Sequence, residues 1–162
     1  MIKRGKKAQT MAMPFEMIFS IFLVIIFIVV AFIAINYFLD LGKCGTTGKF
    51  YENLQIKINE AYSSDSSSFD FDINLPSGIE KVCFANINAE ISNEEDFDLI
   101  KSYNGEANLF LIPSGKACNM PYKVLKNINI TEITKTQNPY CIDASGKLRI
   151  TKDIYDSQVL VK

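Results

Sequence analysis

An uncharged run over residues 17–35 constrains this chain more than any other stretch. Its nineteen residues include no Gly and no Pro, and Ser20 carries its single polar side chain. A helix rises about 1.5 Å per residue, so the run would span nearly the hydrocarbon thickness of a bilayer, about 30 Å. β-Branched and aromatic residues favour a strand in water, but a lone segment in lipid satisfies its backbone groups only as a helix. We therefore predict a transmembrane helix over residues 17–39.

A cleaved secretory signal and a buried core helix are the two other interpretations of this run. The apolar region of a signal covers roughly 7 to 15 residues and ends at a small-x-small cleavage site. Here the spacing of Ala31 and Ala34 does not fit such a site, and Asn36 and Tyr37 follow. A core helix of a soluble protein has a polar stripe at helical period, which this run lacks. Cleavage on the far side is therefore not expected.

Charges are distributed unevenly around the run. Lys3, Arg4, Lys6 and Lys7 precede it without an acid among them, whereas residues 40–162 hold thirteen basic and seventeen acidic side chains. By the positive-inside rule, the tail over residues 1–16 stays in the cytoplasm and the C-terminal part lies outside. The lipid bilayer is thus an expected partner. Nucleic acid is not, because phosphate contacts need clustered Lys and Arg.

Four cysteines, Cys44, Cys83, Cys118 and Cys141, all follow the run. An even set in an exported domain predicts two disulfides, with three pairings open, and each bridge would stabilise the fold by about 2 to 4 kcal/mol. The chain has no His and no CxxC pair, so neither a metal site nor a cofactor is expected. Phosphate-loop, nucleophile-elbow and zinc-protease motifs are also missing from the sequence, which predicts a non-enzymatic role. Ser and Lys are plentiful, so a Ser–Lys dyad stays open.

About 120 residues follow the run, enough for one compact domain over residues 40–162. We expect the membrane helix to stop near Gly42, and residues 44–48 to form a turn. An amphipathic helix is predicted over residues 49–62, with a core-facing stripe of Tyr51, Leu54, Ile58 and Tyr62. A capping box that starts at Ser92, with Glu95 at the third helical position, predicts a short helix whose acids face water.

The rest of the domain reads as short strands between turns. Alternating or continuous apolar residues predict strands over residues 69–74, 79–87, 107–112, 122–125, 127–133 and 159–161, and a hairpin of residues 140–142 and 148–150. Asn129 begins an Asn-x-Thr sequon, which makes it a candidate for glycosylation outside the cell. The predicted fold class is therefore α+β: a long hydrophobic N-terminal helix, then a small, β-rich, disulfide-bonded extracytoplasmic head.

The sixteen residues before the apolar run resemble a known targeting signal. A basic tail, then Lys7, Ala8 and Gln9, then Glu16 just ahead of the run, is similar to the class III signal peptide of archaeal type IV pilins and archaellins. The resemblance implies that a pilin-type signal peptidase cuts between Ala8 and Gln9 and that the apolar helix is retained. It also implies that Glu16 neutralises the new amino terminus of a neighbouring subunit during assembly.

The match departs from the family at one position. In those families the Glu is usually the fifth mature residue, whereas Glu16 is the eighth if Gln9 is the first. A cut after Met11 would make it the fifth, but Met suits that site poorly. A second interpretation needs no peptidase: Pro14 suits the first helical position, and an acid two residues later faces the positive end of the helix dipole.

Two functions follow from these interpretations. In the first, the chain is a pilin-like subunit that packs residues 17–39 against copies of itself in an extracellular filament. In the second, the chain stays uncut as a single-pass membrane protein whose ectodomain binds a partner or belongs to an envelope complex.

Overall fold

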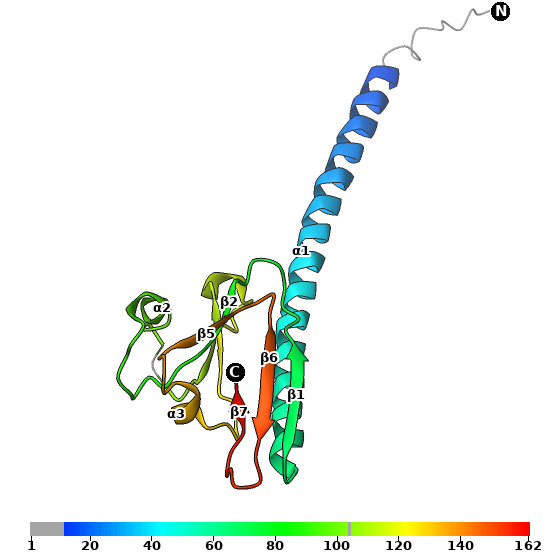
Figure 1. Ribbon diagram of the computed structural model, residues 1–162. Helices are drawn as coiled ribbons and strands as arrows, with labels where there is room; N and C mark the ends of the chain where they lie inside the picture. Colours follow the sequence, from blue (N-terminus) through cyan, green and yellow to red (C-terminus); the bar gives the residue numbers. More distant parts are fainter. Residues whose placement is uncertain (1–11, 104) are drawn as a thin grey trace, which may run out of the picture. The chain divides into compact units, whose positions relative to one another are not determined.

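A computed structural model describes residues 12–103 and 105–162, which form two compact units that meet between Leu41 and Gly42. One helix, α1 (Ala12–Ser63), is 52 residues long and belongs to both units (Figure 1). The second unit adds a β-rich head with two disulfides. The predicted fold class, α+β with a long apolar N-terminal helix, is therefore confirmed.

The predicted break near Gly42 is wrong, because α1 continues through residues 44–48 without a turn. Each Gly weakens a helix by about 1 kcal/mol relative to Ala, but only Pro removes a backbone hydrogen bond. The hydroxyls of Thr46 and Thr47 donate to backbone oxygens one turn earlier, and Thr47 is fully buried in the head. Packing of the next turns into the head therefore outweighs the local preference of the glycines.

Replacing Gly45 by alanine should stabilise the head. Gly45 lies inside α1 and is exposed, and an added Cβ would have no atom within 4 Å. Ala therefore gains helix propensity and loses less backbone entropy on folding, without a clash, which raises the free energy of unfolding by about 0.5 to 1 kcal/mol. Urea unfolding followed by tyrosine fluorescence measures the change. A lower stability would show that the glycine is needed where it stands.

Seven strands form two antiparallel sheets in the described part of the head. A three-stranded sheet has the order β1-β6-β7, and a four-stranded sheet has the order β4-β3-β2-β5. The elements after α1 are β1 (Ser67–Asp72), β2 (Lys81–Phe84), α2 (Glu94–Asp98), β3 (Leu109–Ile112), η1 (Ser114–Lys116), β4 (Tyr122–Lys123), α3 (Ile130–Ile133), β5 (Tyr140–Asp143), β6 (Lys147–Lys152) and β7 (Leu160–Val161).

Two strand predictions are wrong. β5 and β6 do not form a hairpin with each other: β5 pairs with β2, and β6 pairs with β1 and β7. The turn over residues 143–146 thus carries the chain from one sheet to the other, and Cys141 lies opposite Cys83 in the register. Residues 127–133 end in helix α3 because Asn129 caps it, its side-chain oxygen accepting the N–H of Glu132 at 3.1 Å.

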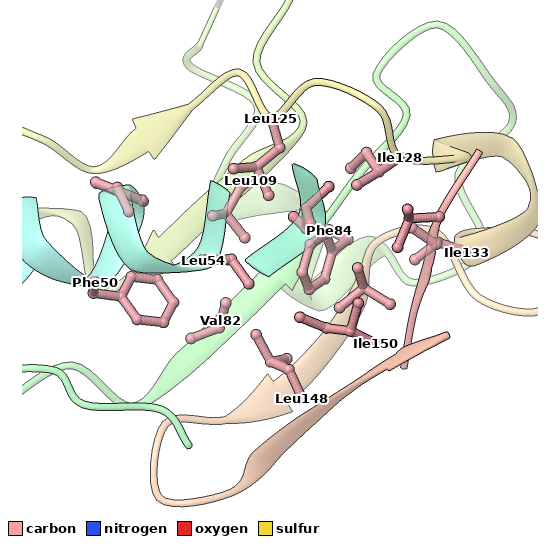
Figure 2. Close-up of a cluster of buried hydrophobic side chains, with 14 of the residues drawn as sticks. Phe50, Leu54, Val82, Phe84, Leu109, Leu125, Ile128, Ile133, Leu148 and Ile150 are labelled. Atoms are coloured by element: carbon pink, nitrogen blue, oxygen red, sulfur yellow. The ribbon is translucent and has the colours of Figure 1, made fainter. Parts of the chain in front are cut away.

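The main core lies between α1 and both sheets (Figure 2). Leu54 of α1, Phe84 of β2 and Ile150 of β6 have no exposed surface and belong to one cluster. Of the predicted stripe on α1, Tyr51, Leu54 and Ile58 are buried, while Tyr62 is 44% exposed. Ala61 takes the buried position at the last turn of the helix instead. The second half of α1 is therefore a central element of the head.

A second, smaller core covers the other side of β2 and β3. Cys83 and Ala85 alternate with Val82 and Phe84 along the chain, and the two pairs belong to different clusters. Successive side chains of a strand point to opposite faces. The four-stranded sheet is therefore buried on both faces at its centre, which accounts for the continuous apolar sequence of β3.

Candidate membrane and assembly segment

The first unit presents apolar side chains on all sides of a helix. Between Phe15 and Leu41 the large hydrophobic side chains are 39% to 72% exposed, and the most apolar 18-residue window of α1 has a mean hydropathy of 3.4 with none of it buried. At about 1.5 Å per residue, residues 17–39 span roughly 35 Å. By length and composition this helix suffices to cross a membrane.

The processing residues predicted from the sequence, Ala8 and Gln9, lie outside the described residues. Glu16, the predicted assembly residue, lies on α1 at the edge of the apolar segment and is exposed. Asp40 closes the segment at its other end, and no charge lies between the two. A carboxylate at a membrane face is unfavourable unless it is paired or reaches water. The two acids therefore delimit the stretch that apolar surroundings must cover.

Both predicted disulfides are present, and the structure selects one of the three pairings. Cys44 of α1 bonds Cys118, 74 residues later, with their Cα atoms 5.2 Å apart. Cys83 of β2 bonds Cys141 of β5, 58 residues later, with Cα atoms 4.0 Å apart. The first bridge ties α1 to the loop after η1, and the second joins two neighbouring strands. The first bridge therefore holds α1 to the head, and the second reinforces the pairing of β2 with β5 within the four-stranded sheet.

The glycosylation candidate, Asn129, lies apart from these bridges. Its side-chain oxygen is the N-cap of α3, and its backbone N–H donates to Val159 at 2.9 Å. The side chain is half-buried, while Thr131 of the same sequon is exposed. The sequon therefore lies at the start of a helical turn.

The acidic stretch of α2 differs from the prediction in two ways. Asn93, not Ser92, caps the helix, because the Ser92 hydroxyl accepts the backbone N–H of Asn138 at 2.8 Å instead. Asp96 is not solvated but 5% exposed, and it accepts a hydrogen bond from the amine of Lys81 at 2.7 Å. That hydrogen bond raises the pKa of Lys81 above its usual range. This ion pair links α2 to β2.

The hydroxyl of Tyr51 has a role that the core-facing stripe did not indicate. Its hydroxyl donates to the backbone oxygen of Met120 at 2.7 Å, which joins α1 to the segment before β4. Burial, with a smaller contribution from Tyr103, raises the pKa of the Tyr51 phenol well above its usual 10.0. The neutral phenol is therefore part of the folded state.

Replacing Tyr51 by phenylalanine should destabilise the head by about 0.5 to 1.5 kcal/mol at pH 7, because the Met120 oxygen loses its donor. Since the folded pKa is raised, the stability that the phenol contributes is complete below pH 10.0 and is lost as the pH rises further. The difference between wild type and variant should therefore shrink at pH 11. Urea unfolding at the two pH values measures it, and an unchanged difference would contradict the role given to the phenol.

Among residues 12–103 and 105–162, no group of three or more Cys, Asp or Glu side chains is placed to hold a metal ion. The apolar segment of α1 is therefore the feature of the described chain that most needs a partner. Comparisons with family models, with curated proteins and with solved structures found no match to this chain.

Proposed function

We propose that this chain is a non-enzymatic, pilin-like subunit of an archaeal surface filament. In the proposal, a pilin-type peptidase cuts between Ala8 and Gln9, and residues 17–39 leave the bilayer to pack against the same residues of neighbouring copies. The disulfide-bonded head remains outside the filament core.

The observation that carries the proposal is the uniform exposure of the apolar segment. Its side chains are exposed around the whole circumference of α1, without a polar stripe. One partner helix covers only one face of such a segment, so full burial requires either lipid or several surrounding helices. A bundle of copies supplies those helices, and the N-terminal motif supplies a way out of the membrane.

The continuity of α1 also supports a filament. The same helix that is apolar up to Leu41 contributes Leu54 and Ile58 to the core of the head, and Cys44 ties it to Cys118. A head that is built around its own helix stays attached to that helix when the helix changes its surroundings. This suits a subunit that moves from lipid into an assembly.

A second candidate function is a permanent anchor whose ectodomain binds a partner or belongs to an envelope complex. The position of Glu16 favours it, because Glu16 is the eighth residue after the proposed cut and not the fifth. In this case the basic tail is retained in the cytoplasm and residues 17–39 of α1 stay in the bilayer.

Mass spectrometry of the protein isolated from native membranes tests the cut directly. The filament proposal expects a mature chain that begins at Gln9, and it expects Ala8→Glu to leave the precursor intact. Wild-type protein that still begins at Met1 or Ile2 would overturn it in favour of the anchor.

Sedimentation of sheared surface material tests the assembly. Wild-type protein should pellet as fibres, and Glu16→Gln, which removes the charge but keeps the shape, should lower the pelleted fraction at least about tenfold. Glu60→Gln is the matched control, since Glu60 is an exposed acid on the head part of the same helix. Protein found only as single chains or small complexes in the membrane would favour the anchor.

A further inference from the structure

The connection between β6 and β7 presents two apolar side chains to solvent. Tyr155 is 97% exposed and Ile154 is 67% exposed. The turn that carries them is held in shape, because the backbone N–H of Asp153 donates to the Asp156 carboxylate at 3.0 Å and the N–H of Asp156 donates back to the Asp153 oxygen at 3.0 Å. We call residues 153–156 the Tyr155 turn. A preformed turn loses little entropy on binding, and Tyr is a common anchor of interfaces.

A mainly apolar groove lies elsewhere on the head, between α1 and the residues around β4. Its volume is about 340 Å³, and its walls include Tyr51, Gln55, Ile56, Met120 and Lys123. Ile56 is 46% exposed there although it belongs to α1. We call this feature the Ile56 groove. Its size is at the low end of the range for ligand clefts, which suits one or two side chains better than a large ligand.

Hydrogen bonds fix both walls of the Ile56 groove. Tyr51 donates to the Met120 oxygen at 2.7 Å, and the Gln55 side chain accepts the Lys126 N–H at 2.9 Å while it donates to the Lys126 oxygen at 3.2 Å. The groove is thus open before anything binds. A rigid groove and a rigid turn meet the requirement of preorganisation on both sides.

The two features differ in the sign of their net charge. Asp153 and Asp156 flank the apolar tip of the turn, while Glu52 and Lys123 line the groove and Lys126 lies beside it, so the groove region has one base more than it has acids. Neither lysine forms an ion pair with another residue of the described part of the chain. Complementary charges of this kind guide the approach of two surfaces and fix their register.

We propose that the Tyr155 turn of one copy of this chain docks into the Ile56 groove of a second copy. The proposal deepens the filament function and rests on it, because it supplies the contact between neighbouring heads. Turn and groove are different surfaces of one head, so each docking event leaves a free turn on one copy and a free groove on the other. A contact of this heterologous type propagates into open chains unless its rotation closes a ring.

Self-association of the full chain tests this contact. The chain is purified in a detergent with micelles in excess, so that each helix is covered separately, and its sedimentation is followed over a range of protein concentrations. Tyr155→Ala and Ile56→Gln should each weaken the association at least about tenfold, as for a buried anchor and its pocket. Leu99→Ala is the matched control, because Leu99 is a 51% exposed side chain outside both features. Variants that associate as tightly as wild type would overturn the proposal.

A mixture of the two variants makes the test specific. The Tyr155→Ala chain keeps its groove and the Ile56→Gln chain keeps its turn. The turn of the second chain can therefore dock into the groove of the first, and the mixture should form complexes of two chains but none of three or more. The charge-reversed pair, Asp153→Lys with Lys123→Glu in the second chain, should likewise regain the affinity that each change loses alone. A mixture that stays monomeric would overturn the proposal.

Two controls separate this proposal from others. Glu16→Gln should leave the association of heads in detergent unchanged, so a failure of the filament function and a failure of this contact give different results. Phosphatidylcholine vesicles probe a lipid role for the turn. Residues 17–39 insert in every variant, so the readout is iodination of Tyr155 by a water-soluble reagent. If Tyr155 is shielded in vesicles while Tyr155→Ala leaves self-association in detergent unchanged, the turn is a lipid contact and the proposed docking is wrong.

Discussion

Replacing both Cys83 and Cys141 by alanine is expected to lower the free energy of unfolding of the head by about 2 to 5 kcal/mol. The bridge joins β2 to β5, the edge strand of the four-stranded sheet, and Cys83 has no exposed surface. Its removal frees a loop of 58 residues in the unfolded chain and also removes two sulfur atoms from the second core. Both effects favour unfolding.

Urea unfolding of the full chain in detergent, followed by tyrosine fluorescence, measures this loss. Alanine at both positions avoids a free thiol that could exchange with the Cys44–Cys118 bridge. The matched variant with alanine at positions 44 and 118 should lose a similar free energy of unfolding. Its bridge closes a loop of 74 residues, and closing this loop costs only about 0.2 kcal/mol more entropy than closing the loop of 58 residues. A loss below about 1 kcal/mol for the first pair would show that strand pairing alone holds β2 and β5.

The elements that follow one periodic pattern were predictable from the sequence. The stripe of Tyr51, Leu54 and Ile58 on α1 and the alternation of Phe69 and Phe71 in β1 both reflect burial at regularly spaced positions. Burial of apolar surface is the largest favourable contribution to folding, so it usually outweighs the local conformational preferences of single residues.

The end of α1 and the partners of the strands could not be predicted, because both depend on contacts between residues far apart in the sequence. Gly42 reads as a stop because a glycine weakens a helix, yet the buried turns that follow from Phe50 onward keep α1 continuous. The hairpin of β5 and β6 was inferred from a short turn, but strand partners depend on long-range contacts such as the Cys83–Cys141 bridge. Asp96 was placed in water because no local signal shows that Lys81 lies beside it.

The candidate segment was predicted more completely than the head. Predicting a helix long enough to cross a membrane requires only the composition and length of a segment, and both can be taken from a single sequence. The Tyr155 turn and the Ile56 groove required coordinates, because the groove combines α1 with residues about 70 positions later. An exposed Tyr in a loop and an exposed Ile in a helix are ordinary in a sequence until their surroundings are known.

Leu54→Ala is expected to lower the free energy of unfolding of the head by about 3 to 5 kcal/mol. Leu54 has no exposed surface and lies in the main core with residues of both sheets, such as Val82 and Leu148 (Figure 2). Truncation removes its apolar contacts and leaves a cavity that the strands and their disulfide cannot close.

Ile56→Ala is the matched control, since Ile56 is two residues later on the same helix and 46% exposed. It should change stability by less than about 1 kcal/mol, because little apolar surface returns to water. If α1 merely touched the outside of the head, the two variants would behave alike. A large difference between them would show that the second half of α1 is the central packing element of the head.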